Sequence, residues 1–418
     1  MLMKIAIMSD LHIGPSAKAQ DLCPIECAGD TSKYQEKFKN YIQDFHAFLV
    51  AENIAADYLL VPGDITQDAH PMEMKLASEF LRGVQNRLSI ADDHLLFVPG
   101  NHDADWTLYD ANDKTGLKWE HRYLALKGSD FIFDSINRNR NAVGDLLCTP
   151  FFKLWQFDDL VVVGYNSASR DTKDTKTHCG DIVKEHLDQL EAELKKLPQD
   201  RDSRIRIGMV HHHLRNFSLP KPSDRDYSIA SNGEDLIDLL RKYHFDFIVH
   251  GHRHHSHFAG RALPMPILSA GSFSAILETS LAQLTTNQFH VVEIQRDASR
   301  DVVGFVRSWS NTVLGWSRSE ENKQSRCLGY ERPFGKTLNS RDLSDKVVKA
   351  FERVCSRNVQ FFTWKDDVVK ECPEVIYLVE NVEDVIAWCQ QNVCQRFNLD
   401  LKQGAERDIF FISKGGAE

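Results

Sequence analysis

The stretch Leu95-Leu-Phe-Val-Pro-Gly-Asn-His-Asp103 joins an apolar run to a polar ending. Residues 95–98 have the length and composition of one strand of a parallel sheet that is covered on both faces, and the Pro-Gly pair is typical of its end. The three polar residues that follow are of types that bind metal ions or transfer protons. Ligands of open α/β sheets bind just beyond the carboxyl ends of the strands. The stretch therefore predicts a buried strand that delivers functional side chains to a site.

Four other apolar runs end in the same way. They are Ile5–Ser9 before Asp10-Leu11-His12, Tyr58–Pro62 before Gly63-Asp64, Ile205–Val210 before His211-His212-His213, and Phe245–His250 before Gly251-His252-Arg253-His254. Because the carboxyl ends of parallel strands meet at one edge, we expect a single site assembled from the whole sheet. In the Asp-x-His and His-x-His pairs, the pleat of an extended segment would place both side chains on the same side.

Length and composition indicate an ordinary globular protein with more than one domain. The chain has 418 residues, of which 42% are hydrophobic and 26% charged, and this length exceeds what one core usually serves. No apolar run approaches the ~20 residues of a membrane helix, and the N-terminus leads directly into a strand rather than a signal peptide. Nine cysteines without paired spacing favour reduced thiols, so we expect a cytoplasmic protein. Because no apolar run is long enough for a membrane helix, we expect no membrane partner.

Helices and strands are predicted to alternate along most of the chain. Amphipathic spacing predicts helices over Tyr34–Glu52, Met72–Leu88 and Ile182–Leu197, and Leu160–Asn166 reads as a further strand. The aromatic-rich segment between Asp103 and Pro150 is interpreted as a partly helical insertion beside the site. This order predicts an α/β fold with parallel, right-handed connections.

The C-terminal part is predicted to be a separate module. Residues 1–317 form the first domain, the polar composition of 318–338 predicts a linker, and 339–418 are expected to form a small α/β domain. Within it we expect a helix over Leu343–Val354, a strand over Val375–Val379, a helix over Val382–Val393 and a strand over Ile409–Ile412. We expect this module to mediate protein contacts or oligomerisation, or to cover the site.

Seven side chains at the strand ends can act as metal ligands. They are Asp10, His12, Asp64, Asn101, His211, His252 and His254. Seven donors exceed the four ligands of one tetrahedral ion, whereas two ions that share a bridging carboxylate would use them all. Asp64, which follows Gly63, suits the bridge. Ligands without thiolate favour two divalent or trivalent transition-metal ions, namely Mn, Fe or Zn.

The charge of such a centre suits an anionic substrate. Two carboxylates supply a charge of -2 against at least +4 from two metal ions, so the surplus would attract a phosphoester. Two such ions polarise the phosphoryl oxygens and convert bound water to hydroxide near neutral pH.

The motifs, taken in order, resemble those of the calcineurin-like metallophosphoesterase superfamily over about residues 1–317. The pattern from Gly63 to Asp68 is most similar to the branch with class III cyclic-nucleotide and glycerophosphodiester phosphodiesterases. The resemblance implies a four-layer α/β/β/α sandwich and phosphoester hydrolysis. It assigns Asp10, His12, Asp64 and His254 to one metal ion, and Asp64, Asn101, His211 and His252 to the other. It also implies that His102 contacts the phosphate and protonates the leaving oxygen, with Asp103 orienting it. His212 is the alternative to His211.

Three functions remain open from the sequence. The first is a dinuclear phosphodiesterase for a small nucleotide or similar diester, the second a nuclease acting on DNA or RNA chains, and the third a non-enzymatic scaffold. The formal charge of -10 does not favour broad capture of a nucleic-acid backbone. The complete ligand set argues against the scaffold.

Overall fold

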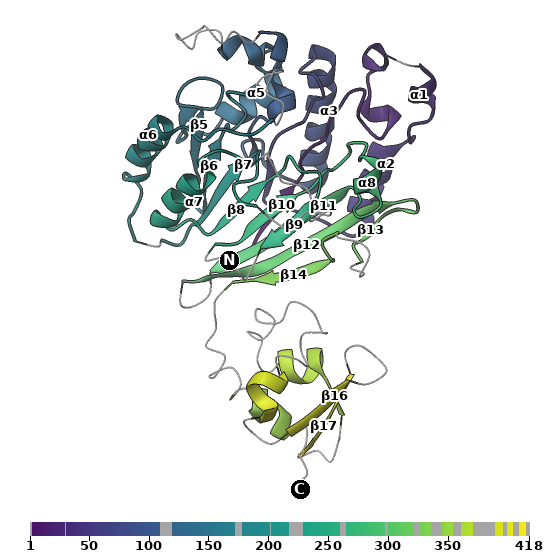
Figure 1. Cartoon of the computed structure of the whole chain (residues 1–418), viewed down its shortest axis with the longest axis vertical. Helices are drawn as coiled ribbons and strands as arrows, with labels where there is room; N and C mark the ends of the chain where they lie inside the picture. The colour runs from purple at the N-terminus through teal and green to yellow at the C-terminus, as the bar shows by residue number, and fades with distance from the viewer. Residues whose placement is uncertain are drawn as a thin grey trace. The chain divides into compact units, whose positions relative to one another are not determined.

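The computed structural model divides into two compact units (Figure 1). The first comprises Met1–Arg300 and Val306–Tyr330, and the second Asp301–Phe305 and Glu331–Glu418. The structure describes residues 2–29, 31–108, 119–171, 178–200, 202–216, 229–259, 265–296, 300–320, 327–335, 345, 347–353, 361–370, 389–395, 399–403 and 409–414.

Two seven-stranded sheets form the centre of the fold. The first contains β13 (Gly315–Arg318), β12 (Val302–Thr312), β11 (Gln288–Arg296), β1 (Met3–Ile7), β2 (Tyr58–Val61) and β3 (Leu95–Phe97) in this order, with β14 (Glu331–Phe334) paired to β12. The second contains β4 (Val143–Asp145), β5 (Phe152–Gln156), β6 (Leu160–Tyr165), β7 (Ile205–Val210), β8 (Phe247–His250), β10 (Ile267–Ala270) and β9 (Ser256–Ala259) in this order. Strands β1, β2 and β3 are parallel, as are β6, β7, β8 and β10. The strands predicted to form one sheet are therefore divided between two.

Helices cover the outer faces of the sheets. Helices α6 (Lys184–Leu194) and α7 (Gly233–Lys242) lie on one side, and α2 (Tyr41–Ala51) and α3 (Pro71–Leu88) on the other (Figure 1). On α2, the ring of Phe45 lies 4.8 Å from that of Phe273 and 5.2 Å from that of Phe289 on β11. This arrangement confirms the predicted α/β/β/α sandwich.

The ends of two helices have identifiable local causes. At the start of α3, His70 Nδ1 accepts the Met72 N–H at 3.2 Å, and Glu73 Oε2 accepts the His70 N–H. Such a capping box satisfies N–H groups that have no partner within the helix. Helix α2 begins later than predicted, because Asn40 takes a left-handed conformation with φ +60°; the preceding residues form only the short α1 (Thr31–Gln35).

Shorter elements fill the connections. They are η1 (Gln20–Leu22), η2 (Ile25–Cys27), η3 (Asn101–Asp103), η4 (Trp106–Leu108), η5 (Trp119–Tyr123), α4 (Leu124–Lys127), α5 (Asp130–Asn137) and α8 (Thr279–Ala282). Elements η4, η5, α4 and α5 make the segment after Asp103 partly helical, as predicted.

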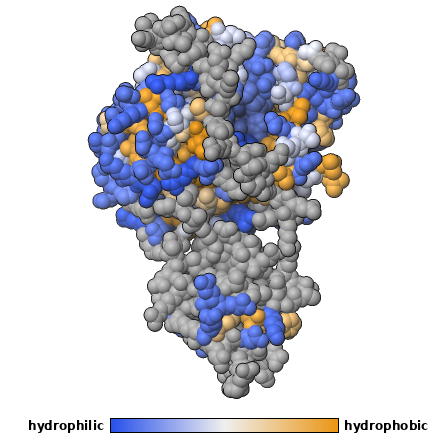
Figure 2. Space-filling model, in the orientation of Figure 1, coloured by the Kyte–Doolittle hydropathy of each residue, from blue (hydrophilic) through white to orange (hydrophobic). Residues whose placement is uncertain are grey.

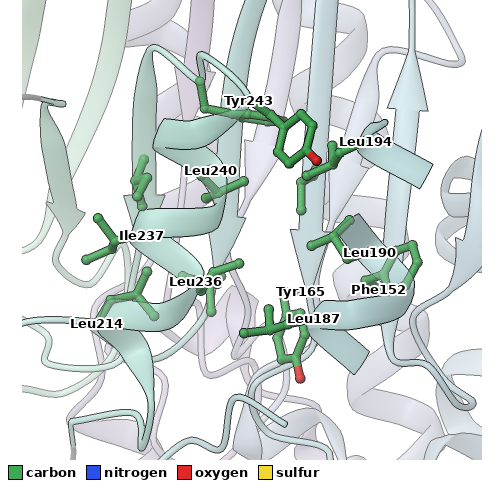
Figure 3. Close-up of a cluster of buried hydrophobic side chains, with 14 of the residues drawn as sticks. Phe152, Tyr165, Leu187, Leu190, Leu194, Leu214, Leu236, Ile237, Leu240 and Tyr243 are labelled. Carbon is green, nitrogen blue, oxygen red and sulfur yellow. The ribbon is translucent and has the colours of Figure 1, made fainter. Parts of the chain in front are cut away.

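A hydrophobic cluster holds α6 and α7 on the second sheet. Leu187, Leu190 and Leu194 of α6 meet Leu236 and Leu240 of α7 above buried strand residues, as Figure 3 shows. The leucines repeat at helical spacing, so each helix presents one apolar face to the sheet. This packing fixes the frame from which β7 and β8 reach the site.

Truncating Leu240 should destabilise this frame. The side chain is 1% exposed, and Leu240→Ala would remove buried apolar volume and leave a cavity. We expect the free energy of unfolding to fall by about 2–5 kcal/mol, measured by urea denaturation. Leu314→Ala, at a side chain that is 95% exposed, is the control and should change it by less than about 0.5 kcal/mol. Equal effects of the two variants would contradict this account of the core.

The visible surface of the first unit is mostly hydrophilic, with hydrophobic residues scattered over it (Figure 2). Within the described part of the chain, no helix has the length and apolar character needed to cross a bilayer.

The second unit contains a small three-stranded sheet. Its order is β15 (Phe361–Thr363), β17 (Ile409–Lys414) and β16 (Leu399–Gln403), with the π-helices η6 (Trp364–Val369) and η8 (Gln390–Cys394). Residues 347–353 are helical, within the helix predicted over 343–354. The strand predicted over 375–379 and residues 382–388 of the helix predicted over Val382–Val393 lie outside the described residues, and the rest of that helix overlaps η8.

The predicted linker over 318–338 is wrong in part. Strand β14 lies within it, and Cys327, Leu328 and Phe334 are buried. The polar composition of the segment did not indicate this strand.

Candidate metal centre

The five polar strand endings converge on one site. Asp10 and His12 follow β1, Asp64 follows β2 and Asn101 follows β3 in the first sheet, whereas His211 follows β7 and the segment with His252 and His254 follows β8 in the second. Cross-sheet contacts join them: the His252 N–H donates to Asp10 Oδ1 at 3.0 Å, and His211 Nδ1 lies 2.8 Å from the Pro62 carbonyl oxygen, which follows β2. The site is therefore built where edges of the two sheets meet.

The backbone turns left-handed at most of these residues. The φ angle lies between +48° and +75° at Asp10, His12, Asp64, His252 and His254. The pleat of an extended strand therefore does not bring the Asp-x-His and His-x-His side chains together, and the predicted reason for their convergence is wrong. A non-glycine residue in this region costs about 1–2 kcal/mol, and such strain is concentrated at functional sites.

Gly63 and Gly100 allow two of the turns to approach closely. Gly63 has φ +94°, and a Cβ added there would lie 2.5 Å from His211 Nδ1 and 2.7 Å from the Gly100 nitrogen. A side chain at Gly63 would displace the His211 ring and the backbone of Gly100.

Asp64 lies between two groups of donors. Its Oδ2 is 3.2 Å from His211 Nε2 and 3.5 Å from His12 Nε2. On one side, ligand atoms of Asp10, His12 and His254 lie within 4.8 Å of one another. The ligand atoms of Asp10, Asp64 and His211 also lie within 4.8 Å of one another and link this side to the other. On the other side, His211 Nε2 is 3.1 Å from Asn101 Oδ1 and 3.2 Å from His252 Nδ1. The structure thus brings all seven predicted side chains together, with Asp64 central.

Hydrogen bonds outside the centre turn imidazole lone pairs toward it. His211 Nδ1 is 2.8 Å from the Pro62 carbonyl oxygen, and His12 Nδ1 is 2.9 Å from Gln67 Oε1. Because these oxygens only accept, each Nδ1 carries the proton in the neutral ring, and each Nε2 presents its lone pair.

These lone pairs face other acceptors. His211 Nε2 faces Asn101 Oδ1 and Asp64 Oδ2, and His12 Nε2 faces Asp64 Oδ2. Hydrogen-bond acceptors that point at one another can share a cation. These nitrogen and oxygen atoms therefore fit as ligands of metal ions.

The sequence comparison agrees with this geometry. The model of the calcineurin-like phosphoesterase family matches residues 3–256, a range that contains all seven side chains. The chain belongs to the calcineurin-like phosphoesterase family. Members of this family are dinuclear metal-dependent phosphoester hydrolases. No curated protein matches the phosphoesterase.

Several solved structures are similar to the phosphoesterase at low identity. A dimetal phosphatase from Danio rerio is 12% identical, with TM-score 0.45, over 78% of this chain and 99% of that chain. GAP50, the anchor in the inner membrane complex of Plasmodium, is 12% identical, with TM-score 0.39, over 78% and 91%. A phosphopantetheinyl hydrolase from Mycobacterium tuberculosis is 15% identical, with TM-score 0.34, over 64% and 89%. These likenesses are too distant to add to the family assignment.

The electrostatics of the phosphoesterase site favour bound cations. Burial, reinforced by His254 and His102, lowers the pKa of His12 to about 3, and burial with neighbouring imidazoles lowers that of His252 well below its usual range. Both rings are thus neutral, as metal ligation requires. Burial opposes ionisation of Asp64, but His211, His102 and His12 outweigh it and hold the pKa of Asp64 well below its usual range. Burial also opposes a charge on His211, yet Asp64 raises the pKa of His211 to about 9, so the pocket attracts positive charge.

The geometry favours His211 over His212 as the ligand. His212 Nδ1 lies 2.8 Å from Ser167 Oγ, and its ring packs against Gly180, whereas His211 faces both Asp64 and Asn101. The ring of His212 nevertheless lies beside that of His252, at a centroid distance of 4.2 Å.

Asp103 does not orient His102, and this prediction is wrong. The buried Asp103 carboxylate accepts the N–H groups of Gly100, Asp64 and Thr66 at 2.8–3.0 Å. It therefore holds the loops after β2 and β3 together. His102 Nδ1 instead donates to the Gln67 carbonyl at 2.7 Å, and the His102 N–H donates to Asp64 Oδ1 at 2.9 Å.

The sequence interpretation missed Gln67. Its carbonyl contacts His102 and its side chain contacts His12, while its own N–H points to Ile13 O and Glu73 Oε2 at 3.1 and 3.2 Å. The only available signal was Glu73 in the first turn of α3, which fixes the loop containing Gln67. Nothing in the pattern shows which way that loop faces.

Replacing Gln67 should weaken metal binding without unfolding the phosphoesterase. Gln67→Leu removes the acceptor that orients His12, and we expect affinity for Mn²⁺ to fall about 10- to 100-fold, measured by titration of metal-free protein. The matched control is Gln43→Leu on the exposed face of α2. Unchanged affinity in Gln67→Leu would contradict the role of this contact.

Proposed function

We propose that the chain is a dinuclear metal phosphodiesterase that hydrolyses a small nucleotide or similar diester. The observation that carries the proposal is the position of Asp64 between two groups of acceptors that shared metal ions would satisfy. Family membership already gives the coarser function, a metal-dependent phosphoester hydrolase.

Two ions would be held by the seven side chains. Asp10, His12 and His254 would hold one, Asn101, His211 and His252 the other, and Asp64 both. Mn, Fe or Zn suits these nitrogen and oxygen ligands. When bound, such a pair neutralises phosphoryl charge and generates a nucleophile from water near neutral pH.

We propose that His102 transfers a proton to the leaving oxygen. One of its ring nitrogens lies within 4.8 Å of ligand atoms of His12 and Asp64. Its Nδ1 is fixed on the Gln67 carbonyl, which leaves Nε2 for the substrate, and the residue is partly exposed.

Replacing His102 should separate chemistry from metal binding. His102→Gln cannot act as a general acid, so we expect kcat to fall about 10²-fold while the metal content stays at the wild-type level. Steady-state kinetics with elemental analysis of the same sample tests this. A wild-type kcat in the variant would remove His102 from the mechanism.

A substrate panel tests the proposed function. Manganese-loaded protein is offered cyclic nucleotides, glycerophosphodiesters, single-stranded DNA and phosphomonoesters. The proposal expects turnover of small diesters with little dependence on salt. Turnover of oligonucleotides alone, with a steep salt dependence, would indicate a nuclease. No turnover of any ester, together with no bound metal, would indicate a scaffold.

We further propose that the module of residues 339–418 makes protein contacts. Phe361 and Phe411 form a cross-strand pair on β15 and β17, and they are 51% and 49% exposed. Exposed aromatic rings are typical of protein interfaces. If the wild-type chain is oligomeric by light scattering, Phe411→Ser should shift it toward the monomer; a monomeric wild type would rule out contacts between copies.

A further inference from the structure

Three aromatic rings form a row beside the metal centre, here called the aromatic wall: His102, Trp106 and His178. The rings of His102 and Trp106 are 5.3 Å apart with an interplanar angle of 45°, and those of Trp106 and His178 are stacked 4.8 Å apart at 10°. All three residues are partly exposed, and the His178 side chain is 34% exposed. Trp106 and His178 each cover one face of the other, so the wall offers the remaining exposed part of its rings beside the metal centre.

Hydrogen bonds to buried groups hold the residues of the aromatic wall in place. His178 Nδ1 lies 3.0 Å from the carboxylate of Asp171, whose side chain is fully buried. The buried Arg122 guanidinium donates to the carbonyls of Ser169 and Asp171, and the Arg122 carbonyl accepts the Asp105 N–H at 2.8 Å. Arg122 thus ties the segment that carries Trp106 to the segment that carries His178.

Both ends of the wall adjoin the proposed metal ligands. His102 belongs to the group with His12 and Asp64. Near the other end, Gly180 packs against the His212 ring, whose centroid is 4.2 Å from that of His252. The wall therefore lies beside the place where a phosphoester would bind at the centre.

We propose that Trp106 and His178 bind a planar unsaturated ring of the substrate, an inference that rests on the proposed function and narrows its substrate class. A flat ring stacks on tryptophan or imidazole, whereas a saturated ring of similar size cannot match the contact. The ring can belong to a nucleobase or to a simple aryl ester. Glycerol-like esters would lack this contact.

Phosphonates test the wall without turnover. Phenylphosphonate and cyclohexylphosphonate are similar in size and charge, and their binding to the manganese-loaded chain is measured by calorimetry. We expect the phenyl compound to bind about tenfold more tightly. Thymidine 5′-monophosphate against deoxyribose 5-phosphate is the second pair, and it shows whether a nucleobase receives the same preference.

Variants of the wall residues show which side chains cause the tighter binding of the phenyl compound. Trp106→Leu should abolish the phenyl preference, and Trp106→Phe should keep it. His178→Gln, which retains a donor for Asp171 but lacks the ring, should reduce it. Trp316→Leu, a matched substitution in the aromatic cluster around α2, should leave it unchanged.

The outcomes distinguish this inference from the proposed function. Equal binding of the phenyl and cyclohexyl compounds would refute ring binding by the aromatic wall, even if diesters are hydrolysed. A phenyl preference that survives both Trp106→Leu and His178→Gln would refute it as well. A preference that appears in the wild type and is lost in the variants supports the wall even if the diester panel fails.

Discussion

Replacing Asp64 by asparagine is expected to lower kcat/KM for a diester about 10³-fold and to leave the protein folded. Asp64 Oδ2 is the atom shared by His211 and His12, so its loss removes the bridge between the two ligand groups. The loss of a paired metal centre removes several kcal/mol of transition-state stabilisation, which corresponds to this factor.

The fold of this variant should persist for a specific reason. Asparagine Oδ1 can still accept the His102 N–H, which Asp64 Oδ1 accepts at 2.9 Å, and its amide N–H groups can donate to the imidazole lone pairs. We therefore expect a melting temperature no lower than that of the metal-free wild type. The matched control is Asp68→Asn on the exposed side of the same loop. Full activity in Asp64→Asn, or equal losses in both variants, would refute the bridging role.

Removing metal ions should abolish activity and lower stability together. Without metal ions, the proton on His211 serves only part of this set, and the other acceptors of Asp64, Asn101 and the imidazoles face one another. A ligand present at 100 times its Kd stabilises the folded state by about 2.7 kcal/mol, so chelation should lower the melting temperature by several degrees. Calorimetric melts and rates with EDTA, then with added Mn²⁺, measure both effects.

The Asp64→Asn variant serves as the control for this experiment. Because its amide supplies hydrogen-bond donors in place of cations, its melting temperature should respond much less to EDTA. Identical wild-type melts and rates with and without EDTA would contradict a metal-dependent centre.

The sequence predicted which residues meet but not how they meet. Apolar runs with polar endings identify β1, β2, β3, β7 and β8, because burial on both faces leaves a continuous hydrophobic signal. Whether such strands form one sheet or two depends on long-range pairing, which a local pattern does not encode. The strand pattern alone indicated a single sheet, and the division between two sheets came from the family resemblance, which implied the α/β/β/α sandwich.

Within the site, local geometry was the least predictable feature. Asp10 and Asp64 are left-handed, a conformation that residues other than glycine adopt only rarely, so residue type alone does not predict it. The role predicted for Asp103 falls to Gln67 for a related reason: the Asp103 carboxylate bonds to backbone N–H groups, and the backbone carbonyl of Gln67 orients His102. The residue types in the sequence do not indicate backbone contacts of this kind.

Metal stoichiometry is the most direct test of two ions bridged by Asp64. The full-length chain is loaded with Mn²⁺, freed of excess ions and analysed for metal per mole of protein, beside Asp64→Asn prepared identically. We predict two ions per wild-type chain and fewer than one in the variant. A wild-type chain that retains no more than one ion, or a variant that retains two, would contradict the account.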